Sequence, residues 1–222
     1  MNWLTGAWAI FLKDLRLELR SRYALNMLLM FVLTSLLLIL YAVAQETISE
    51  RVQAALLWVV ILFSAAIGLG RVFIGEEERG TVLLLQLNAT GSMVFAGKLL
   101  FNFLLVVGMN LVAAGAFLVL LDMPVVLPGL LVVTMLLGGI GLSGATTFLA
   151  AVIARTSNHG PLLPVLLFPV LIPLLLSVIS ATHTAMVGNG WAEARSELLT
   201  LVGFAGVVIT AAVLLFDYVW KD

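Results

Sequence analysis

Hydrophobic and polar positions fall into long blocks along this chain, with extended apolar runs separated by short polar segments. A helix needs about 20 apolar residues to cross the hydrocarbon core of a bilayer, and its backbone must satisfy its own hydrogen bonds there. The runs lack the apolar–polar alternation of membrane barrel strands, so we expect helices. Six spans are predicted, at about 24–44, 52–74, 95–121, 129–154, 160–182 and 198–219.

The segment before the first span, residues 3–20, has a different pattern, typical of an amphipathic helix. Its apolar residues recur on one helical face, at Leu4, Trp8, Phe11, Leu12, Leu15 and Leu19. Charged residues lie off that stripe, at Lys13, Asp14, Arg16 and Arg20, and Glu18 lies at its edge. We interpret this segment as an interfacial helix on the membrane surface. The alternative is a soluble helix that packs on a partner.

Composition supports a membrane protein. Of the 222 residues, 63% are hydrophobic and 10% are charged, against about 25% charged residues in soluble domains. The net charge of −1 gives no indication of nucleic-acid binding. The chain has no cysteine, which excludes disulfides and thiolate metal sites. We expect an all-α polytopic membrane protein, with residues 1–222 forming a single transmembrane domain.

The positions of Lys and Arg predict the orientation. Six spans place both chain ends on one side of the membrane, together with the residues near 75–92 and 155–159. Nine of the 11 Lys and Arg residues fall on that side, and only Arg51 and Arg195 fall on the other. Because cytoplasmic segments are enriched in Lys and Arg, we expect both termini in the cytoplasm.

The cytoplasmic loop near residue 80 is the most informative polar segment. It reads Glu76, Glu77, Glu78, Arg79, Gly80 and Thr81, followed by the apolar residues 82–87. Thr81 can cap a short helix. An apolar helix outside the membrane, with Leu83, Leu84 and Leu87, needs a partner that covers it. We therefore predict a docking loop; the alternative is that the helix folds back into the interface and the glutamates are solvated.

Four prolines lie in or next to the fifth span: Pro161, Pro164, Pro169 and Pro173. Prolines remove helical hydrogen bonds and bend helices, so this span is either a gating element or a statically bent one. Asn102 and Asn110 are the only buried-looking amides, and their role stays open. In the outer loop that we expect from His183 to Glu197, His183 and Met186 have the side chains of a heme ligand pair. A lone histidine in such a loop is more often solvated or hydrogen-bonded.

No complete catalytic motif is present. A phosphate-binding loop needs a glycine before its lysine and Ser or Thr after it, but Gly97-Lys98 is followed by Leu99. Energy from ATP must then come from another chain. Gly141-Leu142-Ser143-Gly144 is similar to the serine motif of rhomboid intramembrane proteases. The last span has no histidine to serve as the base, so Ser143 is more simply a packing residue.

Several segments together resemble the heme exporter B (CcmB) family of permeases. They are the amphipathic start at 11–20, Glu78-Arg79-Gly80-Thr81 with its leucines, Gly97-Lys98, and the proline-bearing run 161–176. The resemblance covers the whole chain, and the proline-bearing run is its most specific part. The chain departs from the family at Asn88-Ala89-Thr90-Gly91, where a proline-containing turn is usual.

The resemblance implies a type-2 ABC permease fold and a non-catalytic subunit of a bacterial inner-membrane complex for cytochrome c maturation. It implies an ATP-hydrolysing partner (CcmA), a heme-handling membrane subunit (CcmC), a small accessory subunit (CcmD) and the heme chaperone CcmE. Heme is then a substrate, with no tightly bound cofactor, and two copies of the chain are expected per complex. The alternatives are a permease of another type-2 ABC exporter or a rhomboid-like serine protease.

Overall fold

The computed structural model describes residues 2–43, 48–69, 73, 76, 80–154 and 162–221, without the side chains of residues 154, 162–164 and 217–221. Within these residues every regular element is a helix, and there is no strand. Six of the helices are long and apolar enough to cross a membrane. The prediction of an all-α polytopic membrane protein with six spans is confirmed.

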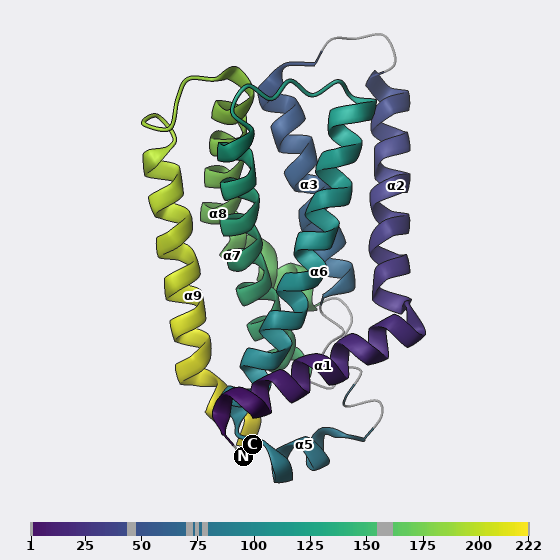
Figure 1. Ribbon diagram of the computed structural model, residues 1–222, viewed down its shortest axis with the longest axis vertical. Coiled ribbons are helices and arrows are strands. Elements are labelled where there is room, and N and C mark those ends of the chain that lie inside the picture. The colour runs from purple at the N-terminus through teal and green to yellow at the C-terminus, as the bar shows by residue number, and fades with distance from the viewer. Residues whose placement is uncertain are drawn as a thin grey trace.

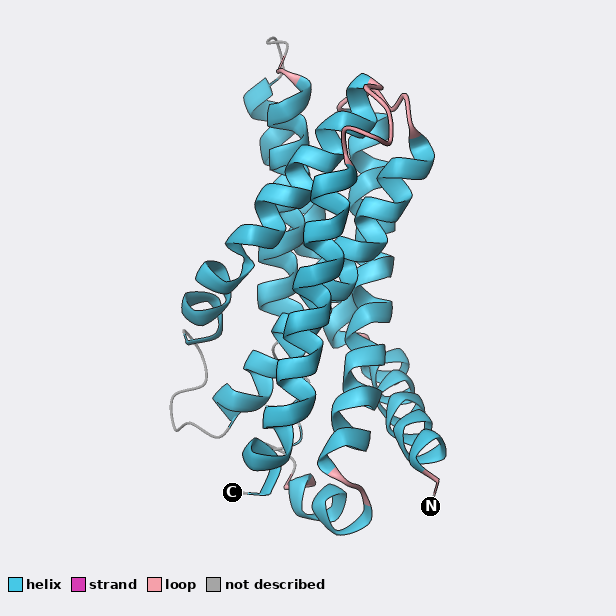
Figure 2. Ribbon diagram, turned by 90° about the vertical axis from the view of Figure 1, so that its left-hand side faces the viewer, coloured by secondary structure: helices cyan, strands magenta, loops and turns pink. Residues whose placement is uncertain are grey.

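The six long helices stand side by side and form a bundle (Figure 1). They are α2 (Tyr23–Val43), α3 (Glu50–Gly68), α6 (Gly91–Leu120), α7 (Pro128–Ala154), α8 (Leu162–Val187) and α9 (Arg195–Lys221). The amphipathic helix α1 (Trp3–Ser21) crosses one end of the bundle, and the short helix α5 (Val82–Asn88) lies beyond that end (Figures 1 and 2). The two helices that are not long apolar spans thus lie at the same end of the bundle.

The centre of the bundle is organised around Trp58 of α3, which is fully buried. Its indole Nε1 donates a hydrogen bond to Thr182 Oγ1 of α8 at 2.9 Å. A Cβ atom on Gly138 of α7 would come within 2.5 Å of the Trp58 ring. Gly138 therefore lets α7 pack directly on the indole, and Trp58 joins three spans at once.

The outer helices have a narrower buried face. In α2 only Leu28, Val32 and Leu36 are buried, one residue per turn along a single stripe. The rest of that helix exposes side chains such as Met30, Leu37 and Leu38. A lipid environment makes this exposure favourable, because lipid tails are as apolar as these side chains.

The end of α8 differs from the sequence prediction. We expected His183 in a loop, but α8 continues to Val187, so that prediction is wrong. The segment after residue 180 has no helix breaker before Gly188, which ends the helix with a φ of +86°. The Gly188 amide still donates to Thr184 O at 3.0 Å. His183 is therefore a half-buried helical residue.

Candidate functional site

The site begins with a close contact between α1 and α6 at Gly97. A Cβ atom there would lie 2.6 Å from the Ala7 carbonyl oxygen and 2.8 Å from Ile10 Cβ. Only glycine fits such an approach, so Gly97 lets α1 lie against α6. The buried residues of α1 are Gly6, Ala7, Ile10, Phe11, Asp14 and Glu18. The face of α1 that packs on the bundle therefore includes two acids, whereas Leu4 and Trp8 of the predicted apolar stripe are exposed.

Lys98, the residue after Gly97, is 0% exposed. Its Nζ lies 3.1 Å from Asp14 Oδ2 and 3.2 Å from Glu76 Oε1, and 5.0 Å from the centre of the Phe73 ring. Lys13 Nζ pairs with Asp14 Oδ1 at 3.3 Å and also with Glu76. We call Lys13, Asp14, Glu76 and Lys98 the charged cluster. Its two cations balance its two anions, which offsets the cost of several kcal/mol for each buried ion.

Glu76 is held in the cluster as a carboxylate. Its burial raises the pKa of the carboxyl group, but the Lys98 charge and hydrogen bonds from Lys13 and Thr81 outweigh this and lower the pKa to about 2. Glu76 therefore stays ionised at neutral pH. Because a carboxylate is a strong acceptor, the Thr81 hydroxyl donates to it. Thr81 is the N-cap residue of α5, yet it makes no side-chain capping bond, so that part of the prediction is wrong.

The charged cluster joins three separate segments of the chain. Lys13 and Asp14 belong to α1, Lys98 belongs to α6, and Glu76 precedes α5. The Thr81 amide also donates to Glu76 O at 3.0 Å, which ties the start of α5 to Glu76. The start of α5 is therefore linked to α1 and α6 through charged contacts.

An apolar cluster lies beside these charges. It includes Ile10, Phe73, Phe95 and Phe216, and the Phe95 and Phe216 ring centres are 5.2 Å apart. Phe73 lies against both Lys98 and Phe216. Phe73 is thus packed where α6 and α9 meet, while Glu76 is ion-paired to α1 and α6.

Helix α5 presents an apolar surface away from the bundle. Val82 and Leu85 pack against the apolar cluster. On the other side, Leu83, Leu84 and Leu87 are 71%, 61% and 82% exposed; we call them the α5 leucines. Because α5 lies outside the long spans (Figure 2), these leucines form an uncovered apolar patch of the kind that marks an interaction site.

The structure separates the residues of the predicted docking loop. Glu76 is buried and bonded within the chain, while the α5 leucines face outward. Gly80 adopts a φ of +65° at the turn into α5. Glu77, Glu78 and Arg79 lie outside the described residues.

Sequence reasoning missed Lys98 and Asp14 as members of this site. The sequence patterns place Lys98 in an incomplete phosphate loop and Asp14 off the apolar stripe, and both in segments of the family resemblance, but they do not pair the two residues. One signal was available: Lys98 is a lone charge where a long apolar helix begins, directly after a glycine. A charge in that position is expensive unless it is paired.

The two amides of α6 connect it to α7. Asn102 Nδ2 donates to Thr147 Oγ1 at 2.8 Å, and Asn110 Nδ2 donates to Met135 O at 3.1 Å. Ser143 is fully buried, and its hydroxyl donates to Ile140 O at 3.0 Å. Among the described residues no histidine or carboxylate bonds to Ser143. These contacts are those of helix packing rather than of a protease nucleophile and its base.

The remaining candidates lie on α8. Pro169 and Pro173 are inside this helix, and Ser177 Oγ donates to Pro173 O at 2.9 Å. Pro164 is in its first turn, with its side chain undescribed, and Pro161 lies outside the described residues. Met186 is buried in the central core, so its sulfur is not presented together with His183 to an outside ligand. Within the described part of the chain, no group of three His, Asp or Glu side chains is arranged to hold a metal.

The six-helix bundle and the amphipathic helix across its end define a multi-pass helical membrane protein. A family model for the CcmB protein matches residues 5–217. The chain belongs to the CcmB protein family.

Three curated relatives agree with this family. Heme exporter protein B of Bradyrhizobium diazoefficiens is 29% identical over 210 residues, which cover 93% of this chain and 94% of the relative. The protein of the same name from Paracoccus denitrificans is 32% identical over 186 residues, 81% of this chain and 84% of the relative. The Rhodobacter capsulatus heme exporter protein B is 32% identical over 173 residues, 76% and 78% of the two chains.

Proposed function

We propose that this chain is the membrane-spanning permease subunit of an ATP-driven heme export or heme-chaperone release complex in the biogenesis of c-type cytochromes. Membership of the CcmB family and similarity to three heme exporter B proteins support this function. Residues 1–222 act as one permease domain in the bacterial inner membrane. The distribution of Lys and Arg supports an orientation with both termini, α1 and α5 in the cytoplasm.

The α5 leucines dock the ATP-hydrolysing subunit. The observation that carries this proposal is their exposure next to the charged cluster, in which the buried Lys98 holds Asp14 and Glu76. Closure of the partner on ATP pushes α5, and the contacts of Glu76 pass that movement to α1 and α6. Transmission of this kind requires an element with two arrangements; α8, with Pro169 and Pro173, is our candidate.

The family resemblance supports the composition of the complex. We propose CcmA as the ATPase, with CcmC, CcmD and the heme chaperone CcmE as further partners, and two copies of this chain. Heme is the cargo rather than a resident cofactor. Passage of heme through the bundle is not required by this proposal, because release of heme-loaded CcmE uses the same ATP-driven movement.

The test is the double substitution Leu84→Asp with Leu87→Asp. Two carboxylates on the docking surface would have to be desolvated against the partner, so we expect co-purification of the ATPase subunit to fall at least about tenfold. Mature c-type cytochromes should be lost in parallel. Membrane insertion should be unchanged, because α5 has no buried residue.

The control is Val126→Asp, which places one carboxylate on an exposed apolar position at the opposite end of the bundle. It should leave ATPase co-purification intact. Normal ATPase binding by the α5 double variant would refute docking on α5. Loss of ATPase binding together with normal c-type cytochromes would refute the proposed role in heme export.

A further inference from the structure

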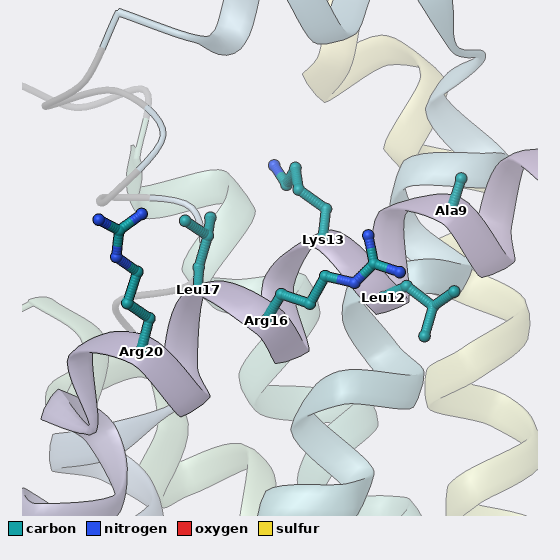
Figure 3. Close-up of a pocket in the computed structure, with 6 residues that line it drawn as sticks. All are labelled: Ala9, Leu12, Lys13, Arg16, Leu17 and Arg20. Atoms are coloured by element: carbon teal, nitrogen blue, oxygen red, sulfur yellow. The ribbon is translucent and has the colours of Figure 1, made fainter.

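A groove of about 420 Å³ runs along α1 on the side away from α6. It is lined by Ala9, Leu12, Lys13, Arg16, Leu17 and Arg20, and Figure 3 shows the three cationic side chains arranged along the helix. The cations follow one another at intervals of three and four residues, which places them on one helical face. We call this surface the basic groove.

The acidic and basic side chains of α1 lie on different faces of the helix. Its two acids, Asp14 and Glu18, are buried. Asp14 pairs with Lys98 and Lys13, while Glu18 Oε1 accepts the Leu25 amide hydrogen of α2 at 2.9 Å. Both acids are thus engaged on the protein side, and within the described residues no acid pairs with Arg16 or Arg20. The outward face is left with a net positive charge.

The basic groove adjoins an apolar stripe that is itself uncovered. Leu12 lines the groove and belongs to the stripe of Leu4, Trp8 and Leu19, which are exposed. Because α1 crosses the bundle at the end of the spans (Figure 1), a bilayer around the spans would bring its headgroup boundary to this stripe. A phospholipid with its phosphate in the groove would have its acyl chains beside Leu12 and Leu17. Arg is suited to phosphate because its planar guanidinium donates two parallel hydrogen bonds.

We propose that the basic groove binds the phosphate headgroup of an anionic phospholipid from the leaflet on which α1 lies. The cations of the basic groove lie next to an apolar stripe. This arrangement fits a lipid, which carries an anionic headgroup and apolar chains in one molecule. An acidic protein surface would match the cations but leave the stripe uncovered. Lys13 belongs to both the basic groove and the charged cluster, so a bound headgroup competes with Glu76 for Lys13 and loosens the link to α5.

The test uses the full-length chain, purified without partners and returned to nanodiscs. Native mass spectrometry would count retained phosphatidylglycerol against phosphatidylcholine for the parent chain and for Arg16→Gln with Arg20→Gln. Each Lys or Arg near an anionic surface strengthens binding about fivefold, so the double variant should bind phosphatidylglycerol about 25-fold more weakly. Both residues are exposed, and the folded bundle should be unaffected.

The control pair is Arg51→Gln with Arg195→Gln, two exposed cations near the other ends of the spans. It should retain the parent preference for phosphatidylglycerol. Millimolar inorganic phosphate should compete only weakly, because it lacks the acyl chains. Three results would overturn the proposal: no preference for the anionic lipid, an equal loss in the control pair, or binding of free phosphate in the groove without binding of the lipid.

Discussion

Lys98 is the residue on which the charged cluster depends. It is fully buried, yet two carboxylates lie within 3.2 Å of its ammonium nitrogen. The effect of such a group on stability depends on whether its partners are present. A complete buried network is roughly neutral in stability compared with apolar residues, while removal of one member leaves the others buried and unbalanced. Lys98 therefore specifies which segments meet rather than simply adding stability.

We predict that Lys98→Met destabilises the protein by about 3 kcal/mol, because Asp14 and Glu76 then share only Lys13. Adding Glu76→Gln should recover most of this loss, since Lys13 and Asp14 remain as a balanced pair. Thermal unfolding in detergent measures both variants. If the double variant were less stable than Lys98→Met, the two side chains would not be coupled. Arg51→Met, at an exposed position, serves as the control and should change stability little.

At the scale of the element, helix α1 is placed by its small residues. Three residues of its predicted apolar stripe are exposed and the other three pack on the core. The contact with α6 is made where Ala7 meets Gly97. Hydrophobic periodicity predicted the helix but not the face that contacts α6. A membrane protein has two apolar environments, lipid and bundle, and periodicity does not distinguish them. The pairing of Asp14 with Lys98 spans 84 residues and is invisible to any local pattern.

Gly97→Val tests the α1–α6 contact. The added side chain would meet the Ala7 carbonyl oxygen, which is backbone and cannot rotate away. We predict that α1 separates from α6, so that a single cysteine at the buried position Ala7 becomes much more reactive toward a maleimide. Gly108→Val on the same helix is the control, because a Cβ atom there meets nothing within 4 Å. Unchanged labelling in Gly97→Val would contradict the packing described here.

At the scale of the whole molecule, the six spans follow from composition, because long apolar runs have one stable form in lipid. The outward face of α5 was also foreseeable, since Leu83, Leu84 and Leu87 follow a polar segment outside any span. The burial of Glu76 was not, because a run of glutamates normally indicates a solvated face. Glu76 is buried beside a lysine that the tertiary fold brings within 3.2 Å.

The most direct test of the proposal that the ATPase acts on the bundle through α5 is crosslinking from α5 in membrane vesicles that contain the complex. The chain has no cysteine, so Leu87→Cys introduces a unique attachment point for a cysteine-linked photocrosslinker. We predict that Leu87→Cys captures the ATP-hydrolysing subunit and that Val126→Cys, exposed at the far end of the bundle, does not. Capture from Val126→Cys alone, or no capture from Leu87→Cys in an assembled complex, would contradict the proposal that the ATPase drives this bundle through α5.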